Sequence, residues 1–129
     1  MNTSKKVIHT SKAPDAIGPY SQAIQIEKTV YISGQIPLIP ETMELAGSNI
    51  QEQAHQVLKN LRAICFAAGG DLNALVKIQI YLTDLNNFQT VNSIMQEYFS
   101  APFPARATLE VSKLPKESAI EIDGIMVLN

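Results

Sequence analysis

Hydrophobic residues in this chain follow two different periods in turn, and the order of those periods limits the fold more than any other feature of the sequence. Over residues 76–83 apolar and polar side chains alternate, the period of two expected of a strand with one buried face. Residues 48–68 and 88–99, on either side, carry apolar side chains at helical spacing. Helices on one face of a mixed sheet would bury both stripes, so the pattern predicts a two-layer α+β fold.

Turn-forming residues set the expected boundaries of these elements. Ser48 begins the first helix, with Gln51 at the spacing of a capping box, and Gly69-Gly70 ends it. Strands that flank a helix are expected to be parallel to each other. No repeat or linker interrupts the chain, so residues 1–129 are expected to form one domain. Strands are expected over residues 6–9, 21–26, 29–32, 76–83, 103–111 and 119–128.

Composition narrows the function classes. The 129 residues are enough for one hydrophobic core. The net charge is -2 and no run of basic residues is present, so the chain lacks the electrostatic pattern of a nucleic-acid binder. A single cysteine excludes an internal disulfide and suits a reducing compartment. The beginning of the chain has no apolar segment of signal-peptide length, and no apolar run is long enough to span a membrane. A cytoplasmic protein is therefore expected.

One arginine is placed where a ligand would be recognised. Arg106 stands in the strand 103–111, flanked by alanines, with Thr108 and Glu110 on the same face. The only other arginine is Arg62, on the polar side of the first helix. A guanidinium with open space around it binds a carboxylate or phosphate through two parallel hydrogen bonds. The alternative is an ion pair with an acidic residue of the same sheet, and the residues alone leave both interpretations open.

The last strand carries a second candidate, Glu121. If this strand and the Arg106 strand form a hairpin with their apolar faces together, Arg106 and Glu121 share the polar face, where a glutamate beside water serves acid–base chemistry. A solvent-facing or lysine-paired carboxylate is the alternative. Gly34, within a strand pattern, indicates a bulge or a close approach to the backbone, or else a plain strand end before Pro37. No phosphate loop, nucleophile elbow or metal-ligand spacing is present, so no cofactor or metal is expected.

Several ordered blocks of sequence resemble the RidA family of reactive intermediate/imine deaminases, also called the YjgF family. The resemblance covers nearly the whole chain, and blocks in one order are far more specific than any one alone. The blocks are Ala16-Ile17-Gly18-Pro19-Tyr20-Ser21-Gln22-Ala23, Ser33-Gly34-Gln35-Ile36-Pro37, Asp84-Leu85-Asn86-Asn87-Phe88 with Thr90-Val91-Asn92, Pro104-Ala105-Arg106-Ala107-Thr108-Leu109, Lys113-Leu114-Pro115-Lys116 and Ile120-Glu121-Ile122.

The resemblance implies a chorismate-mutase-like α+β fold and a homotrimer with clefts between subunits. It implies hydrolysis of enamine and imine acids such as 2-aminoacrylate and 2-aminocrotonate, made by pyridoxal-phosphate dehydratases, to 2-keto acids and ammonia. By position, Arg106 matches the residue that binds the substrate carboxylate and Glu121 the residue that positions water. The other residues that match the substrate cleft are Tyr20, Ser33, Gly34, Asn92 and Thr108.

Three positions depart from the family pattern. Thr108 replaces the cysteine of many bacterial members, the segment 100–103 looks shorter, and Asp123-Gly124 replaces a more usual Glu-Ala pair. Two other functions stay open: a trimer that binds a 2-keto acid without turnover, and an RNA-directed ribonuclease or translation inhibitor. The acidic composition, with an isoelectric point near 5.6, argues against the RNA-directed activity.

Overall fold

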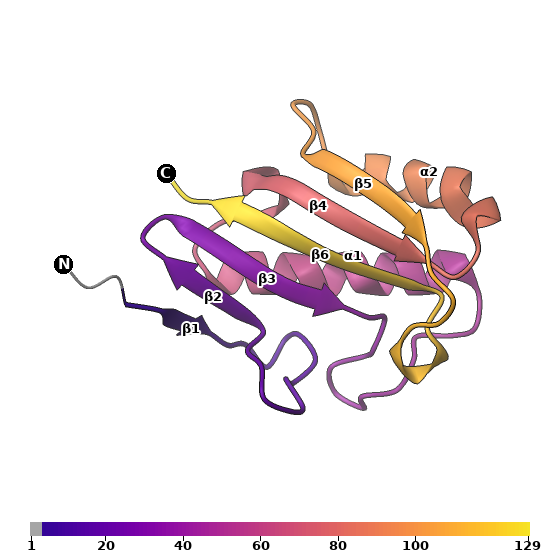
Figure 1. The fold of residues 1–129 in the computed structure, drawn as a ribbon, viewed down its shortest axis with the longest axis horizontal. Coiled ribbons are helices and arrows are strands. Elements are labelled where there is room, and N and C mark those ends of the chain that lie inside the picture. The colour runs from indigo at the N-terminus through magenta and orange to yellow at the C-terminus, as the bar shows by residue number, and fades with distance from the viewer. Residues whose placement is uncertain (1–3) are drawn as a thin grey trace.

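Six strands form one mixed sheet in the order β1-β2-β3-β6-β4-β5 in the computed structural model, which describes residues 4–129 (Figure 1). Helices α1 (Ile50–Ala67) and α2 (Phe88–Tyr98) lie on the same side of this sheet, behind the strands in the figure. Short 3₁₀ helices lie at η1 (Leu72–Ala74), η2 (Leu85–Asn87) and η3 (Pro115–Glu117). The strands are β1 (Lys6–Ile8), β2 (Ala23–Ile26), β3 (Thr29–Gln35), β4 (Leu75–Leu82), β5 (Ala105–Glu110) and β6 (Ile120–Val127).

The core lies between the helices and one face of the sheet. The apolar stripe of α1, including Leu58 and Leu61, is fully buried and packs with Ile120 and Ile122 of β6 in the same cluster. Burying aliphatic side chains of this size stabilises a fold by about 1.5–3 kcal/mol each. Cys65 also lies in this core, where burial raises the pKa of its thiol to about 12. Cys65 is therefore a small residue of the core.

The strand pairing corrects one expectation. β5 and β6 do not form a hairpin, because β6 lies between β3 and β4 and pairs antiparallel with both. β5 pairs in parallel with β4, the strand that precedes α2, and this is the parallel pairing expected across that helix. The chain runs back through residues 111–119 to insert its last strand into the middle of the sheet. The hairpin prediction was wrong because it paired strands that are neighbours in sequence. In the centre of the sheet, β6 forms hydrogen bonds with strands on both sides and buries its apolar residues against the helices.

The orientation of β5 is also the reverse of the one assumed. Arg106 is opposite Ile78, which faces the helices, so Arg106 and Thr108 lie on the helix side. The alanines of β5 and Leu109 lie on the open face of the sheet, the face without helices. No residue of β5 is buried in the subunit, so hydrophobic alternation there did not indicate which face meets the core.

Helix α1 begins one residue later than the sequence indicated. The N-cap is Asn49, not Ser48: the Asn49 side-chain oxygen accepts from the Glu52 N–H at 2.8 Å, and its amide nitrogen donates back to the Glu52 carboxylate at 2.6 Å. This reciprocal pair uses the same three-residue spacing as the predicted capping box, shifted by one position. Within residues 4–129, no helix is long and apolar enough to cross a membrane.

Candidate functional site

Arg106 lines an open pocket between β5 and α2. The pocket has a volume of about 450 Å³, and α2 supplies one of its walls. Strand β5 places Arg106 here because its alternation directs this side chain toward α2, while the residues before the strand close the far side. The lining residues are Asn92, Met95, Gln96, Phe99, Phe103, Pro104 and Arg106.

The guanidinium of Arg106 is held by neutral groups. Its Nη1 donates to the side-chain oxygen of Asn92 at 2.5 Å, and its carbon lies 5.2 Å from the centre of the Phe88 ring. Two ion pairs occur in residues 4–129, His9–Asp15 and Arg62–Asp71, and neither involves Arg106. The alternative of an in-sheet ion pair is therefore not what the described structure forms. A cation presented by an amide and a ring keeps its charge available for an incoming anion.

Glu121 lies on the other face of the sheet, against Gly34. Strand β3 shifts register against β6 between Ile32 and Gln35, and Gly34 lies within this irregularity. A β-carbon at residue 34 would overlap the carboxylate of Glu121. Both indications from the sequence, a bulge and a close approach, are thus present, and the carboxylate occupies the space that any other residue's side chain would fill.

The environment of Glu121 favours its neutral form. Burial, and then the charge of Asp123, raise the pKa of the Glu121 carboxyl above its usual value. Burial also raises the pKa of Asp123, although a hydrogen bond from the Tyr81 hydroxyl, at 3.0 Å, acts in the opposite direction. Tyr81 lies directly across from Glu121 and contacts the side-chain oxygen of Gln79 at 2.6 Å. Sequence reasoning noted Asp123 as a departure from the family and as a possible ion-pair partner of Arg106, and it did not identify Tyr81.

Tyr20 and Gly34 line a second pocket, of about 430 Å³, near Ser33 at the end of β3. Tyr20 is 54% exposed, at the end of the loop between β1 and β2. The Ser33 hydroxyl is already engaged, because it donates to the backbone oxygen of Gln22 at 3.0 Å. Across this pocket stand Pro115 and Lys116 of η3, two residues of the Lys-Leu-Pro-Lys block.

The structure therefore divides the predicted site residues into two groups. Arg106 and Asn92 lie together on the helix side, and Thr108 faces that side from β5. Its hydroxyl oxygen is buried, with no hydrogen-bond partner in the described structure. Glu121 and Gly34 meet on the open side, with Tyr20 and Ser33 nearby. Strand β4 separates β5 from β6, so one subunit does not bring Arg106 and Glu121 into one pocket.

The chain was compared with known families, curated proteins and solved structures. Residues 10–128 match the family described as endoribonuclease L-PSP. The mouse protein named 2-iminobutanoate/2-iminopropanoate deaminase is 50% identical over 123 residues, which cover 95% of this chain and 91% of that protein. RidA from the Antarctic bacterium Psychrobacter superposes with a TM-score of 0.92 at 48% identity, covering 95% of this chain and 99% of that one. The chain belongs to the RidA family.

A second solved member is TdcF of Escherichia coli, determined with bound serine. It is 39% identical, covers 96% of this chain and 99% of that one, and gives a TM-score of 0.92. Likeness to solved RidA-family structures at this level confirms the predicted two-layer, chorismate-mutase-like α+β fold. The sequence blocks around Arg106 and Gly34 predicted the RidA family, and this prediction is confirmed as well.

Two further residues near these pockets were given no role by sequence reasoning. Phe88 was placed on the apolar side of the second helix and inside a family block, but its ring stacks near the Arg106 guanidinium. Gln22 appeared only inside a family block, although its buried side chain holds the loop that precedes Tyr20. A glutamine at the start of a strand carries no signal for burial, so pattern alone had no means of finding it. Within residues 4–129, no group of three or more histidine, cysteine or acidic side chains is placed to hold a metal ion.

Proposed function

We propose that this chain is an enamine/imine deaminase, a hydrolase that converts 2-aminoacrylate- and 2-aminocrotonate-type intermediates to 2-keto acids and ammonia. Curated relatives named 2-iminobutanoate/2-iminopropanoate deaminase share 46–50% of their residues with it over most of its length. The observation that carries the proposal is Arg106, a guanidinium in an open pocket whose described polar partners are uncharged. Such a group suits the carboxylate that every 2-imino acid carries.

The chemistry needs water, proton transfers and correct placement. The enamine first tautomerises to the imine, whose C=N carbon is then attacked by water. Glu121 takes a proton from that water and passes it to the imine nitrogen, which gives the carbinolamine. It then takes the proton of the carbinolamine hydroxyl and returns it to nitrogen as the C–N bond breaks, which releases ammonia and leaves the keto group. Arg106 holds the carboxylate throughout. Because free imines hydrolyse unaided, positioning supplies most of the acceleration that is required.

Assembly of this site is part of the proposal. Arg106 and Glu121 face opposite sides of one sheet, so a cleft that holds both has to draw them from two subunits. The open face of the sheet offers an interface, since Tyr31, Leu109 and Val127 there are 50%, 52% and 42% exposed. The outer edge of β5 is also unpaired in residues 4–129. Apolar area of this kind on a sheet face indicates a protein partner, and we assign it to two further copies, in a homotrimer.

The substrate assignment also places the enzyme in a reaction sequence. Enamine acids are short-lived, so they must be formed close in time to their hydrolysis. Pyridoxal-phosphate dehydratases release them by eliminating water from hydroxy amino acids, and we propose that such an enzyme supplies this one. Tyr20, Ser33, Gly34, Asn92 and Thr108 would complete the substrate cleft, with Gly34 leaving the room that the Glu121 carboxylate occupies.

The test is turnover of 2-aminoacrylate generated in situ by a dehydratase, followed as its loss above the spontaneous rate. Arg106→Ala should lower kcat/KM by at least about ten- to a hundredfold, because a charge-assisted contact worth about 1.5–3 kcal/mol is removed. Arg106→Lys should remain poor, since a point charge does not replace the planar fork. Arg62→Ala is the matched control: it removes the other arginine, which pairs with Asp71 on the outer side of α1.

Two results would contradict the proposal. Wild-type protein that binds pyruvate but leaves 2-aminoacrylate loss at the spontaneous rate would make the chain a 2-keto-acid-binding protein. Unchanged turnover per folded molecule in Arg106→Ala would remove Arg106 from the site. Glu121→Gln separates the roles further: turnover should fall while calorimetric binding of pyruvate survives, because binding depends on Arg106.

A further inference from the structure

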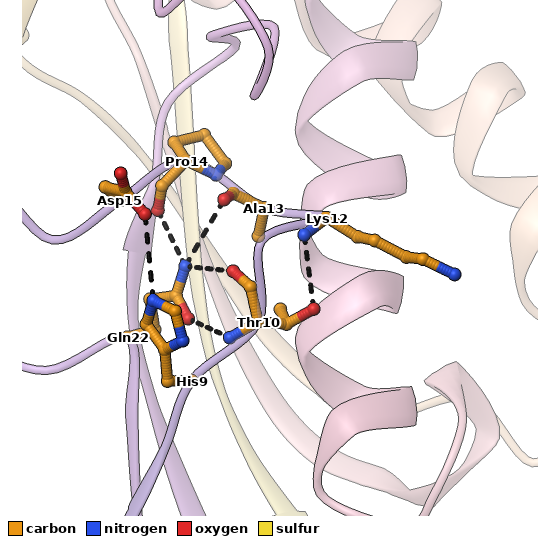
Figure 2. Close-up of polar contacts among 7 residues, drawn as sticks. All are labelled: His9, Thr10, Lys12, Ala13, Pro14, Asp15 and Gln22. Atoms are coloured by element: carbon orange, nitrogen blue, oxygen red, sulfur yellow. Dashed lines mark hydrogen bonds and ion pairs between the residues drawn. The ribbon is translucent and has the colours of Figure 1, made fainter.

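Gln22 is the most thoroughly hydrogen-bonded side chain near the Tyr20 pocket. It stands immediately before β2 and is 2% exposed. Its amide contacts three residues of the turn that follows β1 (Figure 2). A buried amide is costly unless its donors and acceptor are all paired. The surrounding backbone therefore has to supply hydrogen-bond partners for the Gln22 amide.

The pairing is complete. The Gln22 side-chain oxygen accepts from the Thr10 N–H at 2.8 Å, and its nitrogen donates to the carbonyls of Thr10 at 3.0 Å and Pro14 at 2.8 Å. The carbonyl of Ala13 shares the donor at 3.3 Å. Contact with both the N–H and the C=O of Thr10 imitates a peptide group in a sheet ladder. One side chain thus fixes both ends of the turn over residues 10–14 (Figure 2).

The backbone of Gln22 holds the opposite wall of the same pocket. Its carbonyl oxygen accepts from the Ser33 N–H and from the Ser33 hydroxyl, each at 3.0 Å. Ser33 precedes Gly34, whose missing side chain leaves room for Glu121. Pro14, Tyr20, Gln22 and Gly34 all line the pocket of about 430 Å³. Gln22 is therefore the residue through which the loop and the bulge are connected.

Ala13 and Pro14 of this loop are buried, with Ala13 in the core, but few other polar side-chain contacts hold the loop. Figure 2 draws two: the Thr10 hydroxyl oxygen accepts from the Lys12 N–H at 3.2 Å within the turn, and His9 and Asp15 form an ion pair at 3.7 Å with both side chains about 65% exposed. Ion pairs this exposed contribute little because solvent screens them. The hydrogen bond from the Tyr20 N–H to the Gly18 carbonyl, at 2.9 Å, is local and orders only the end of the loop.

We propose that Gln22 is a positioning residue of the imine site: its amide fixes the loop over residues 10–20, and so the Tyr20 ring, relative to Gly34. This inference rests on the proposed function, since it concerns the same cleft. Gln22 touches no reacting atom in it. Its contribution is to order, before substrate arrives, a loop that would otherwise lose conformational entropy on binding.

The test compares three glutamine-to-methionine variants, each of similar size and without the amide. Gln22→Met should raise KM by about tenfold while kcat changes by less than about twofold, because binding geometry is lost but Arg106 and Glu121 stay in place. Gln25→Met is the control on β2, where the side chain makes one exposed hydrogen bond to Glu27. Gln53→Met is the control for burial, since Gln53 also joins two chain segments, at Gly47 and Ala119.

Equal KM values in Gln22→Met and the wild type would overturn the inference, and so would an equal rise in KM in Gln53→Met, which would mark a general loss of stability. Gln22→Glu keeps the shape and the acceptor for Thr10 and makes the same comparison if Gln22→Met does not fold.

Hydrogen exchange of residues 10–20 without substrate gives a second readout: amide protection should fall in Gln22→Met and stay unchanged in Gln25→Met. Unchanged protection in Gln22→Met would also overturn the inference. This readout remains decisive even if wild-type protein hydrolyses no imine, so failure of the proposed function is told apart from failure of the Gln22 proposal.

Discussion

A carboxylate that accepts a proton from water must be ionised at the working pH. The surroundings of Glu121 raise the pH at which its carboxyl ionises. Burial and the nearby Asp123 raise the pKa of the Glu121 carboxyl. A base with a raised pKa is stronger when ionised, and it loses its activity sooner on acidification. The Tyr81 hydroxyl donates to the Asp123 carboxylate at 3.0 Å.

We predict that Asp123→Asn moves the acidic limb of the pH–rate profile to lower pH. The proposed base, Glu121, has to be ionised, so activity is expected to fall as the pH drops through the Glu121 pKa, which lies above the usual 4.5. Removing the Asp123 charge removes one of the two causes of that shift, while burial remains. The measurement is kcat/KM across the acidic range, with Glu97→Gln on the exposed side of α2 as the control. A limb that stays in place, or that moves to higher pH, would show that Asp123 does not act on the base.

The same shifts have a consequence for folding. Both carboxyls bind a proton more tightly in the folded state than in the unfolded chain. Their contribution to stability is therefore fully present below the ordinary carboxyl pKa and is lost as the pH rises through the raised values. Because the two carboxylates oppose each other when ionised, stability and catalysis make opposite demands on Glu121.

At the scale of elements, the irregular end of β3 places Gly34 beside the Glu121 carboxylate. Gly34→Ala should lower deamination at least as much as Glu121→Gln does, because the added methyl group would occupy the space of the Glu121 carboxylate. The trimer and the sheet should persist, since β3 pairs with β6 on both sides of the irregularity. Gly70→Ala is the control: its β-carbon would meet the flexible side chains of Met126 and Leu128 instead. Full activity in Gly34→Ala would mean that Glu121 works from another position.

The elements also show how far sequence reasoning reached. Helix α2 and strand β4 could be predicted because each has one buried face, which imposes a clear period on the residues, whereas β2 and β3 were predicted from runs of β-forming residues. Strand β5 has no buried residue in the subunit, so its alternation was interpreted with the wrong face inward. Insertion of β6 between β3 and β4 could not be read from a pattern at all, because hydrogen bonding between strands leaves no mark on side-chain order.

The site was predictable residue by residue but not as an arrangement. Arg106 was marked by its rarity and by its small neighbours, and Gly34 by its place inside a strand, so local sequence was enough to select them. Their separation onto different faces depends on pairing between distant segments. Tyr81 and Gln22 were missed because a tyrosine in a strand and a glutamine before one are ordinary residues, and only tertiary contacts give them roles.

At the scale of the whole molecule, we predict a trimer of about three times the 14.1 kDa chain mass in light scattering. Leu109→Asp should break it, because a carboxylate placed on the apolar open face would have to be buried without a partner. The subunit should still fold, since Leu109 is 52% exposed within it. Phe66→Asp, on the exposed side of α1, should leave the trimer intact. A wild-type monomer at micromolar concentration would contradict a cleft shared between subunits.

The placement of Arg106 and Glu121 on opposite faces of one sheet leads to complementation between inactive variants. Arg106→Ala and Glu121→Gln are each expected to be nearly inactive alone, because every cleft of a homotrimer then lacks one group. If the two are unfolded, mixed in equal amounts and refolded together, a cleft that takes its arginine from one neighbour and its glutamate from the other is intact by chance in about a quarter of cases. A site contained within one subunit would regain nothing. In a cell that expresses two alleles, the activity of such an enzyme is a property of the mixture, and neither copy alone determines it.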